Sequence, residues 1–318
     1  MAEISAALVK RLREKTDAGM MECKKALQAT ADGGHANEDA WLSAAGDWLR
    51  EKGILKAAKK ADRVAAEGLI GVVSTGSAAA LVEVNSETDF VARNEGFQKA
   101  VRSIADVALK NDGDVTKVAH APSPDGQGTV NEMLQRLVAT IGENMTLRRA
   151  ASLAVDEGVV ATYVHNSAGE GLGKIGVLVA LESSGDKSRL NDLGRKIAMH
   201  VASMKPLAAT TAELDPKVVE KEKAILTAQA AESGKPANVI EKMVEGRIRK
   251  FFQESVLVEQ AFVMDPDTTV GKFIEKHAAE FKAPIKLKGF VKFEVGEGVE
   301  KASSDFAAEV AAFAKPKQ

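Results

Sequence analysis

The sequence predicts an α+β chain with a three-helix amino-terminal domain, a core of two α/β subdomains with small antiparallel sheets, an inserted helical hairpin and a carboxy-terminal helix. Three observations support this class. The 318 residues suffice for two or three domains. Apolar side chains recur at helical spacing in several segments, and abundant alanine favours helices packed by small side chains. Short apolar runs also occur in pairs, as in antiparallel hairpins.

The first part of the chain has the pattern of a small helical bundle. Apolar residues at helical spacing occur within 4–12, 20–27 and 41–49, separated by two short breaks that contain glycine. Ser5 is a suitable helix cap, and Gly53 is expected to close the module. We therefore expect three short helices that share one core.

A basic, alanine-rich connector follows, which carries Lys56, Lys59, Lys60 and Arg63. It is either a solvated helical linker or a nucleic-acid contact. The formal charge of the whole chain is −2, whereas nucleic-acid binders usually carry a strong basic excess. The linker is therefore the favoured interpretation.

The next segment has the pattern of an α/β unit. Two strands are expected at 69–73 and 80–84, followed by a helix whose apolar stripe runs from Phe97 to Ala108. A long loop rich in Asp, Pro and Gly covers 111–128, and a second helix is expected at 130–141.

A similar arrangement occurs again further along the chain. Strands are expected at 159–164 and 175–181, and an apolar stripe over 190–204 predicts a helix. A third strand of this unit is expected late, at 290–295. The second unit would then be interrupted by an insertion.

That insertion has the pattern of a helical hairpin. Helices are expected at 218–231 and 239–256, and the turn between them has Gly234 before Pro236, the order expected at a helix end and a helix start. The last helix is expected on the stripe Phe306, Val310 and Phe313. The expected boundaries are 1–55 (amino-terminal domain), 56–66 (linker), 67–157 (first subdomain), 158–207 with 258–298 (second subdomain), 208–257 (hairpin) and 299–318 (carboxy-terminal module).

Cysteine and apolar content indicate the compartment. Cys23 is the only cysteine of the sequence, so no internal disulfide can form, as expected in a reducing cytoplasm. The sequence contains no apolar stretch that approaches the ~20 residues of a membrane span. We expect a cytoplasmic protein without a membrane partner.

Residues 171–176 (GLGKIG) match the glycine spacing of a dinucleotide-binding loop. That loop requires a helix directly after it, so that phosphate meets the helix amino terminus. Here the apolar, strand-like run 177–181 follows instead. A phosphate-binding loop of the other common type would need Ser or Thr after Lys174, where Ile175 stands. We therefore reject nucleotide binding and expect a flexible hairpin tip.

The residues that usually perform catalysis form no constellation in this sequence. The five histidines (His35, His120, His165, His200, His277) lack the spacing of a zinc site. His200 is expected to pack inside a helical segment, and Cys23 to be a small core residue. His165 ends a strand beside the glycine-rich tip, which makes it the histidine best placed to touch a partner. We expect no enzyme activity, no cofactor and no metal.

Residues 83–93 (EVNSETDFVAR) lead from an apolar strand into a polar corner where Asp89 precedes Phe90. One interpretation is a short tip, half acid and half aromatic wedge, that acts on another protein. The alternative is structural: Thr88 caps a helix, Asp89 stabilises its positive end and Phe90 belongs to the core. The residues alone favour the structural alternative.

Met20 and Met21 stand beside Lys24 and Lys25 at the expected start of the second helix. Methionine fills cores, but flexible thioethers next to cations also suit a docking surface. From these residues alone, core packing is favoured.

Several motifs in succession favour the partner-binding interpretations of Asp89–Phe90 and of the methionine pair, because together they resemble the bacterial elongation factor Ts family. The two most specific are 12–27 (LREKTDAGMMECKKAL) and 83–93. The others are 141–144 (IGEN), 197–202 (IAMHVA), 234–236 (GKP), 241–247 (EKMVEGR) and 293–298 (FEVGEG), so that the resemblance covers nearly the whole chain.

The resemblance implies a guanine-nucleotide exchange factor for elongation factor Tu, the GTPase that carries aminoacyl-tRNA. It implies that Asp89 and Phe90 enter the partner near its bound Mg²⁺ and promote GDP release, while Thr88 and Val91 hold the tip in shape. Mg²⁺ demands near-ideal octahedral geometry, so small displacements of its ligands and waters weaken it.

The resemblance also implies further contacts. Residues matching Arg13, Met20 and Met21 dock on the nucleotide-binding domain of the partner, and Ile141 and His165 match other contact positions. For Met20 and Met21, the resemblance therefore favours docking on the partner over core packing.

The remaining expectations concern other partners. The inserted hairpin corresponds to a region through which some members of the family form homodimers, and 304–310 resemble the final partner-binding module. The loops 111–128 and 166–174 look irregular for the family. Direct nucleotide and nucleic-acid binding are not expected. The alternative function is a plain binding protein of the same GTPase, without exchange activity.

Overall fold

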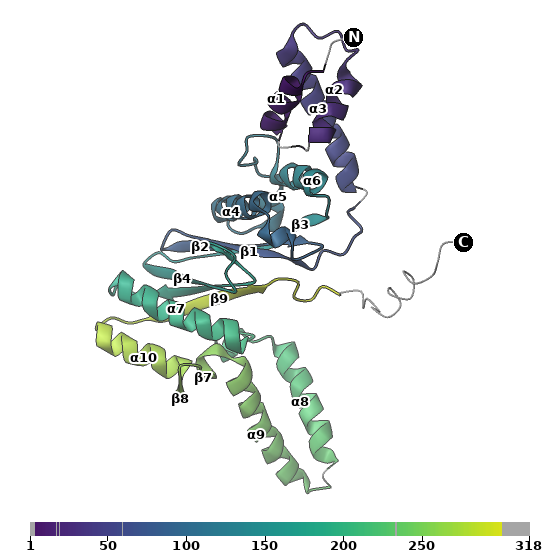
Figure 1. The fold of residues 1–318 in the computed structure, drawn as a ribbon. Helices are drawn as coiled ribbons and strands as arrows, with labels where there is room; N and C mark the ends of the chain where they lie inside the picture. The colour runs from purple at the N-terminus through teal and green to yellow at the C-terminus, as the bar shows by residue number, and fades with distance from the viewer. Residues whose placement is uncertain (1–3, 17, 19, 59, 233, 301–318) are drawn as a thin grey trace.

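The computed structural model describes residues 4–16, 18, 20–58, 60–232 and 234–300, without the side chains of 22, 52 and 54–58. A helical module stands at one end, two sheets pack face to face with helices on their outer sides, and a helical hairpin projects from the other end (Figure 1). The expected α+β class is confirmed. The expected carboxy-terminal helix over Phe306, Val310 and Phe313 lies outside the described residues.

The amino-terminal module consists of α1 (Ala6–Thr16), α2 (Met20–Thr30) and α3 (Glu38–Ala58), as expected. Their common core contains mainly leucine and alanine, together with Trp41 and the buried Cys23. Helix α3 continues past Gly53, where the sequence suggested its end. An added Cβ at Gly53 would lie 3.2 Å from the Cβ of Ala139, so glycine lets α3 pass close to a helix of the core.

The first sheet has the strand order β3-β2-β1-β5 and carries three helices on its outer face. Two strands and two helices of this unit were expected and are confirmed, whereas β3, β5 and α5 were not expected. Its elements are β1 (Glu67–Ser74), β2 (Ala78–Ser86), β3 (Met145–Ala154), β5 (Leu172–Gly173), α4 (Glu95–Lys110), α5 (Val115–His120) and α6 (Val130–Ile141).

The second sheet has the order β4-β6-β9, and all neighbours are antiparallel. The expected late strand is confirmed, since β9 pairs with β6 across the insertion. Its strands are β4 (Gly158–His165), β6 (Ile175–Glu182) and β9 (Lys286–Glu294), and helices α7 (Lys187–Met204) and α10 (Val270–Phe281) cover it. A separate two-stranded sheet consists of β7 (Ala261–Phe262) and β8 (Asp265–Thr269).

The inner faces of the two sheets share a core that includes Ile70, Leu81, Leu178 and Phe293. Gly176 lies within β6 at this interface. An added Cβ there would come within 2.6 Å of Ile70 Cγ2 and 2.9 Å of Leu81 Cδ2. This glycine of the dinucleotide-like pattern therefore permits close sheet packing, and the pattern leads into a strand.

A buried carboxylate ties the two sheets together. Glu83 of β2 is fully buried and accepts hydrogen bonds from Arg148 Nη1 at 3.1 Å, from Arg149 Nε and from the Gly296 N–H at 2.8 Å. Arg149 also donates to the Glu294 carbonyl at 2.9 Å. The charge at the centre of β2 is thus compensated from β3 and from the turn after β9.

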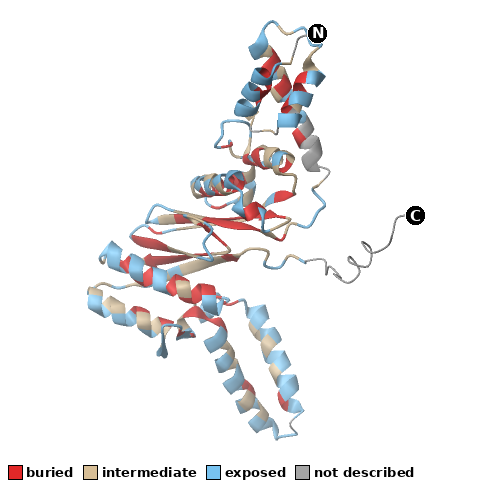
Figure 2. Ribbon diagram, viewed as in Figure 1, coloured by how far each residue is buried: buried red, intermediate tan, exposed pale blue. Residues whose placement is uncertain are grey.

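The insertion is the expected hairpin of α8 (Pro216–Ala231) and α9 (Ala237–Ser255), flanked by the short 3₁₀ helices η2 (Thr211–Glu213) and η3 (Leu257–Glu259). Figure 2 shows that its described residues are mostly exposed, in contrast to the sheets. No helix among the described residues is long and apolar enough to span a bilayer.

His200 joins α7 to the base of the hairpin. Its Nδ1 accepts the Val263 N–H at 3.1 Å, so Nε2 carries the proton and donates to Gln260 Oε1 at 2.8 Å. Gln260 in turn donates to the Glu254 carbonyl at 2.7 Å. Burial lowers the pKa of His200, against the smaller opposing effect of its hydrogen bond to Gln260.

Candidate partner-binding site

Asp89 and Phe90 form an exposed turn between the end of β2 and helix α4. The Ala92 N–H donates to the Asp89 carbonyl at 3.2 Å and the Arg93 N–H to the Phe90 carbonyl at 3.1 Å, which continues the turn into the 3₁₀ helix η1 (Val91–Arg93). The Phe90 side chain is 72% exposed. The Asp89 carboxylate makes no hydrogen bond or ion pair with the described residues. Both side chains are available to another molecule. We call Thr88–Val91 the tip.

The tip is anchored on its carboxy-terminal side. Val91 is buried in the core between the first sheet and its covering helices, together with Phe97. Helix α4 is capped by Asn94, whose Oδ1 accepts the Phe97 N–H at 3.0 Å. The structural alternative is therefore wrong for two residues: Thr88 does not cap the helix, and Phe90 does not belong to the core.

The tip is anchored on the other side through Thr88. The Glu143 carboxylate accepts the Thr88 N–H at 2.9 Å and the Thr88 hydroxyl at 2.7 Å. The Thr88 carbonyl accepts the Ser86 hydroxyl at 2.9 Å. Two ordered residues, Thr88 and Val91, thus bracket the exposed pair.

A second link joins the tip to the basic connector. The Glu87 carboxylate accepts the Asn144 N–H at 2.6 Å and lies 3.5 Å from Arg63. The Asn144 side chain donates to the backbone carbonyls of Arg63 at 2.7 Å and Ala61 at 3.3 Å, and Lys60 Nζ donates to the Gly142 carbonyl. This part of the connector is therefore held against the base of the tip.

Sequence reasoning gave Ile141 a role but missed Glu87, Glu143 and Asn144. The available signal was the 141–144 motif itself. Gly142 has a left-handed φ of 94° directly after α6, so the polar residues that follow it leave the helix and can reach another element.

Arg13, Met20 and Met21 lie on the surface of the amino-terminal module. The methionine side chains are 49% and 65% exposed, while Cys23 and Leu27 of the same helix face the core. Core packing, which the residues alone favoured, is therefore wrong for this pair. Adjacent exposed thioethers form an adaptable apolar surface.

The other two expected contact residues lie on different elements. Ile141 is the last residue of α6, half-buried against the first core, and Glu143 two residues later contacts Thr88. His165 is exposed at the end of β4, where its Nδ1 lies 3.0 Å from the Tyr163 hydroxyl. Ile141 thus lies two residues before Glu143, which contacts the tip, whereas His165 belongs to the second sheet.

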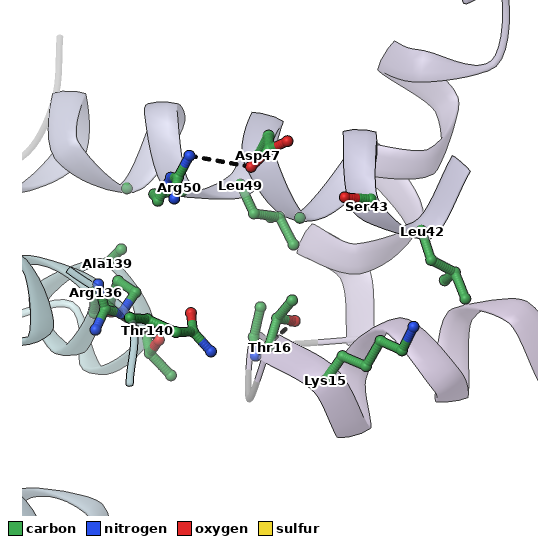
Figure 3. A pocket seen from close by; sticks show the side chains of 14 residues that line it. Lys15, Thr16, Leu42, Ser43, Asp47, Leu49, Arg50, Arg136, Ala139 and Thr140 are labelled. Carbon is green, nitrogen blue, oxygen red and sulfur yellow. Dashed lines mark hydrogen bonds and ion pairs between the residues drawn. The ribbon is translucent and has the colours of Figure 1, made fainter. Parts of the chain in front are cut away.

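A cavity of about 380 Å³ lies where the amino-terminal module meets α6 (Figure 3). Charged side chains at its wall are already paired, Arg50 with Asp47 at 3.1 Å and Arg136 with Asp125 at 2.7 Å. Ala139 and Thr140, just before the end of α6, also line it. The last turn of α6 therefore borders this junction, directly before the residues that contact the base of the tip.

The arrangement is typical of a protein-binding factor: an exposed acid–aromatic tip on a packed core, and a separate module with an exposed methionine pair. Within the described ranges, no three His, Cys, Asp or Glu residues are grouped so as to hold a metal ion.

The comparisons with known proteins agree with this class. The model of the family "Elongation factor TS" matches residues 87–297. Elongation factor Ts of Sinorhizobium medicae (strain WSM419) is 58% identical over 98% of this chain and 99% of that protein. Elongation factor Ts of Parvibaculum lavamentivorans is 58% identical over 99% of this chain and 100% of that protein. That of Hyphomonas neptunium is also 58% identical, over 99% of both chains.

The chain belongs to the elongation factor Ts family. Its role is therefore that of an elongation factor in protein biosynthesis.

Proposed function

We propose that the protein is a cytoplasmic guanine-nucleotide exchange factor that binds GDP-bound elongation factor Tu and accelerates GDP release. Family membership supports the partner, and the exposure of Phe90 on an anchored turn supports the mechanism. An aromatic ring that is 72% exposed gains burial only when it enters another molecule.

The tip acts on the Mg²⁺ site of the partner. Phe90 inserts as a wedge, and Asp89 disturbs the waters and ligands around the ion. Mg²⁺ tolerates little distortion of its octahedral shell, so displacement of one ligand weakens its binding. Without the ion, the phosphate charge of GDP is poorly neutralised and the nucleotide dissociates faster.

Docking residues supply the affinity that keeps the tip in place. Arg13, Met20 and Met21 contact the nucleotide-binding domain of the partner, and Ile141 and His165 add further contacts. In this scheme the protein breaks no covalent bond and binds no nucleotide itself, so it is not an enzyme in the chemical sense.

Thermodynamic linkage makes the effect of the factor on GDP binding equal to the effect of GDP on binding of the factor. The factor must bind the empty partner more tightly than the GDP-bound one, and GDP weakens binding of the factor by the same ratio. A thousandfold increase in the dissociation constant of GDP corresponds to about 4 kcal/mol of coupling.

The test is release of a fluorescent GDP analogue from elongation factor Tu, followed by stopped flow with increasing concentrations of the protein. We expect strong acceleration that falls as free Mg²⁺ is raised, and a smaller maximal rate with Asp89→Asn. Binding without acceleration would instead show a plain binding protein of the GTPase.

A further inference from the structure

Glu143 holds the residue that immediately precedes the exposed pair. Its two carboxylate oxygens accept both hydrogen-bond donors of Thr88, the N–H at 2.9 Å and the hydroxyl at 2.7 Å. Hydrogen bonds to an ionised acceptor are roughly twice as strong as neutral ones. Because both contacts converge on one residue, they fix the Thr88 backbone as well as its side-chain rotamer.

Asn144 repeats this role one residue later. Its N–H donates to Glu87 at 2.6 Å, and its 5% exposed side chain donates to the carbonyl of Arg63 at 2.7 Å. Residues 143 and 144 therefore hold positions 88 and 87: Glu143 binds the Thr88 N–H and hydroxyl, and Asn144 binds the Glu87 side chain.

Glu143 and Asn144 are connected in two ways to the amino-terminal module, which carries Arg13, Met20 and Met21. One is the connector, whose Lys60 and Arg63 contact Gly142 and Glu87. The other is α6, which ends at Ile141 and passes α3 so closely that Gly53 faces Ala139. The connector and the tip thus both contact the short loop 142–144, and α6, which leads into this loop, packs against α3 of the amino-terminal module.

We propose that Glu143 is a positioning residue for nucleotide exchange: by fixing Thr88 it sets the direction in which Asp89 and Phe90 leave the protein, relative to the docking module. The proposal rests on the proposed exchange function. A tip that is ordered before binding loses less conformational freedom when it enters the partner. Loss of Glu143 therefore slows exchange in the bound complex without removing the docking contacts.

Glu143→Ala tests this, with Glu132→Ala as the matched control. Glu132 likewise accepts the N–H of a threonine, Thr129, at 2.8 Å, but it caps the start of α6 rather than holding the tip. The assay is fluorescent GDP release from elongation factor Tu at increasing factor concentration. It separates the maximal rate from the concentration that gives half of it.

For Glu143→Ala we expect roughly a tenfold lower maximal rate, because losing a charge-assisted hydrogen bond costs about as much free energy as a tenfold change in rate requires. The half-maximal concentration should remain within about twofold, since Arg13, Met20 and Met21 are untouched. Glu132→Ala should change neither quantity, although both variants lower the unfolding temperature. A wild-type maximal rate in Glu143→Ala, or an equal fall in Glu132→Ala, overturns the proposal.

Thr88→Val keeps the inference testable if Glu143→Ala does not fold. It conserves side-chain shape but removes the hydroxyl that donates to Glu143 at 2.7 Å. We expect a lower maximal rate with an unchanged half-maximal concentration, and a rate equal to wild type would overturn the proposal. If the unmodified protein does not accelerate GDP release, the exchange function itself fails, which is a different outcome from normal exchange by these variants.

Discussion

Phe90 and Phe97 stand seven positions apart and should respond oppositely to truncation. Phe90 is 72% exposed, whereas Phe97 is fully buried in the core between the first sheet and its covering helices. Complete burial of a phenylalanine contributes about 1.5–3 kcal/mol, so the covered part of Phe90 contributes less than about 1 kcal/mol. Removing a buried phenylalanine costs about 3–5 kcal/mol, because a cavity remains. Phe90→Ala should leave the fold intact, and Phe97→Ala should strongly destabilise it.

Urea-induced unfolding followed by far-ultraviolet circular dichroism measures both free energies. The comparison requires equal slopes of free energy against urea concentration, which shows that both variants unfold from similar folded states. A loss for Phe90→Ala as large as that for Phe97→Ala would mean that Phe90 supports the fold. The assignment of Phe90 as a surface wedge would then be refuted.

Three other predictions concern the buried charge, a histidine and the docking pair. Glu83→Ala should cost about 3–5 kcal/mol in urea unfolding, since it removes the fully buried carboxylate that pairs with Arg148 and leaves Arg149 with Glu297 alone; a loss below about 1 kcal/mol would contradict the assigned role. Burial lowers the pKa of His200, so the unfolded chain takes up a proton at a higher pH than the folded protein does. The stability that neutral His200 contributes is therefore fully present above the unfolded pKa of about 6.5, and it is lost as the pH falls from there to the folded pKa. Unfolding measured from pH 8 to pH 5 should show this loss, and His200→Gln should flatten that part of the profile; an unchanged profile would exclude His200 as its source. The double variant Met20→Ala with Met21→Ala should raise the half-maximal factor concentration for GDP release about tenfold at an unchanged maximal rate, and a lower maximal rate with unchanged half-saturation would contradict a docking role.

Helices with a clear apolar stripe were predictable from the sequence. The stripe Phe97, Val101, Ile104 and Ala108 is buried in the structure as one face of α4. Such a pattern is local and follows directly from helix geometry. The strand pairs β1–β2 and β4–β6 were predictable from their continuous apolar runs, but β5, which lies within the connection between β4 and β6 and pairs with β1, was not.

Strand β3 was not predictable, because its environment depends on residues far away in the chain. Arg148 and Arg149 give it a polar appearance, and their charges are compensated by Glu83, more than sixty residues earlier. The same argument applies to Glu143, whose contact with Thr88 spans 55 positions. Pairing at such distances leaves no periodic signal in either segment.

The candidate site shows where residue type misleads. Met20 and Met21 are apolar and lie at the start of a helix, which favours core packing, yet both are exposed. Phe90 is exposed although aromatic residues usually enter the core. Exposed apolar side chains of this kind depart from the pattern that stabilises the fold, and such departures are expected at functional sites.

The most direct test of the central claim compares the unmodified protein with Phe90→Ala in the release of fluorescent GDP from elongation factor Tu, at saturating factor concentration. The account predicts strong acceleration by the unmodified protein and a much lower maximal rate with the variant, which should remain folded. Equal acceleration by a folded Phe90→Ala protein would contradict the wedge mechanism, and no acceleration by either protein would contradict nucleotide exchange.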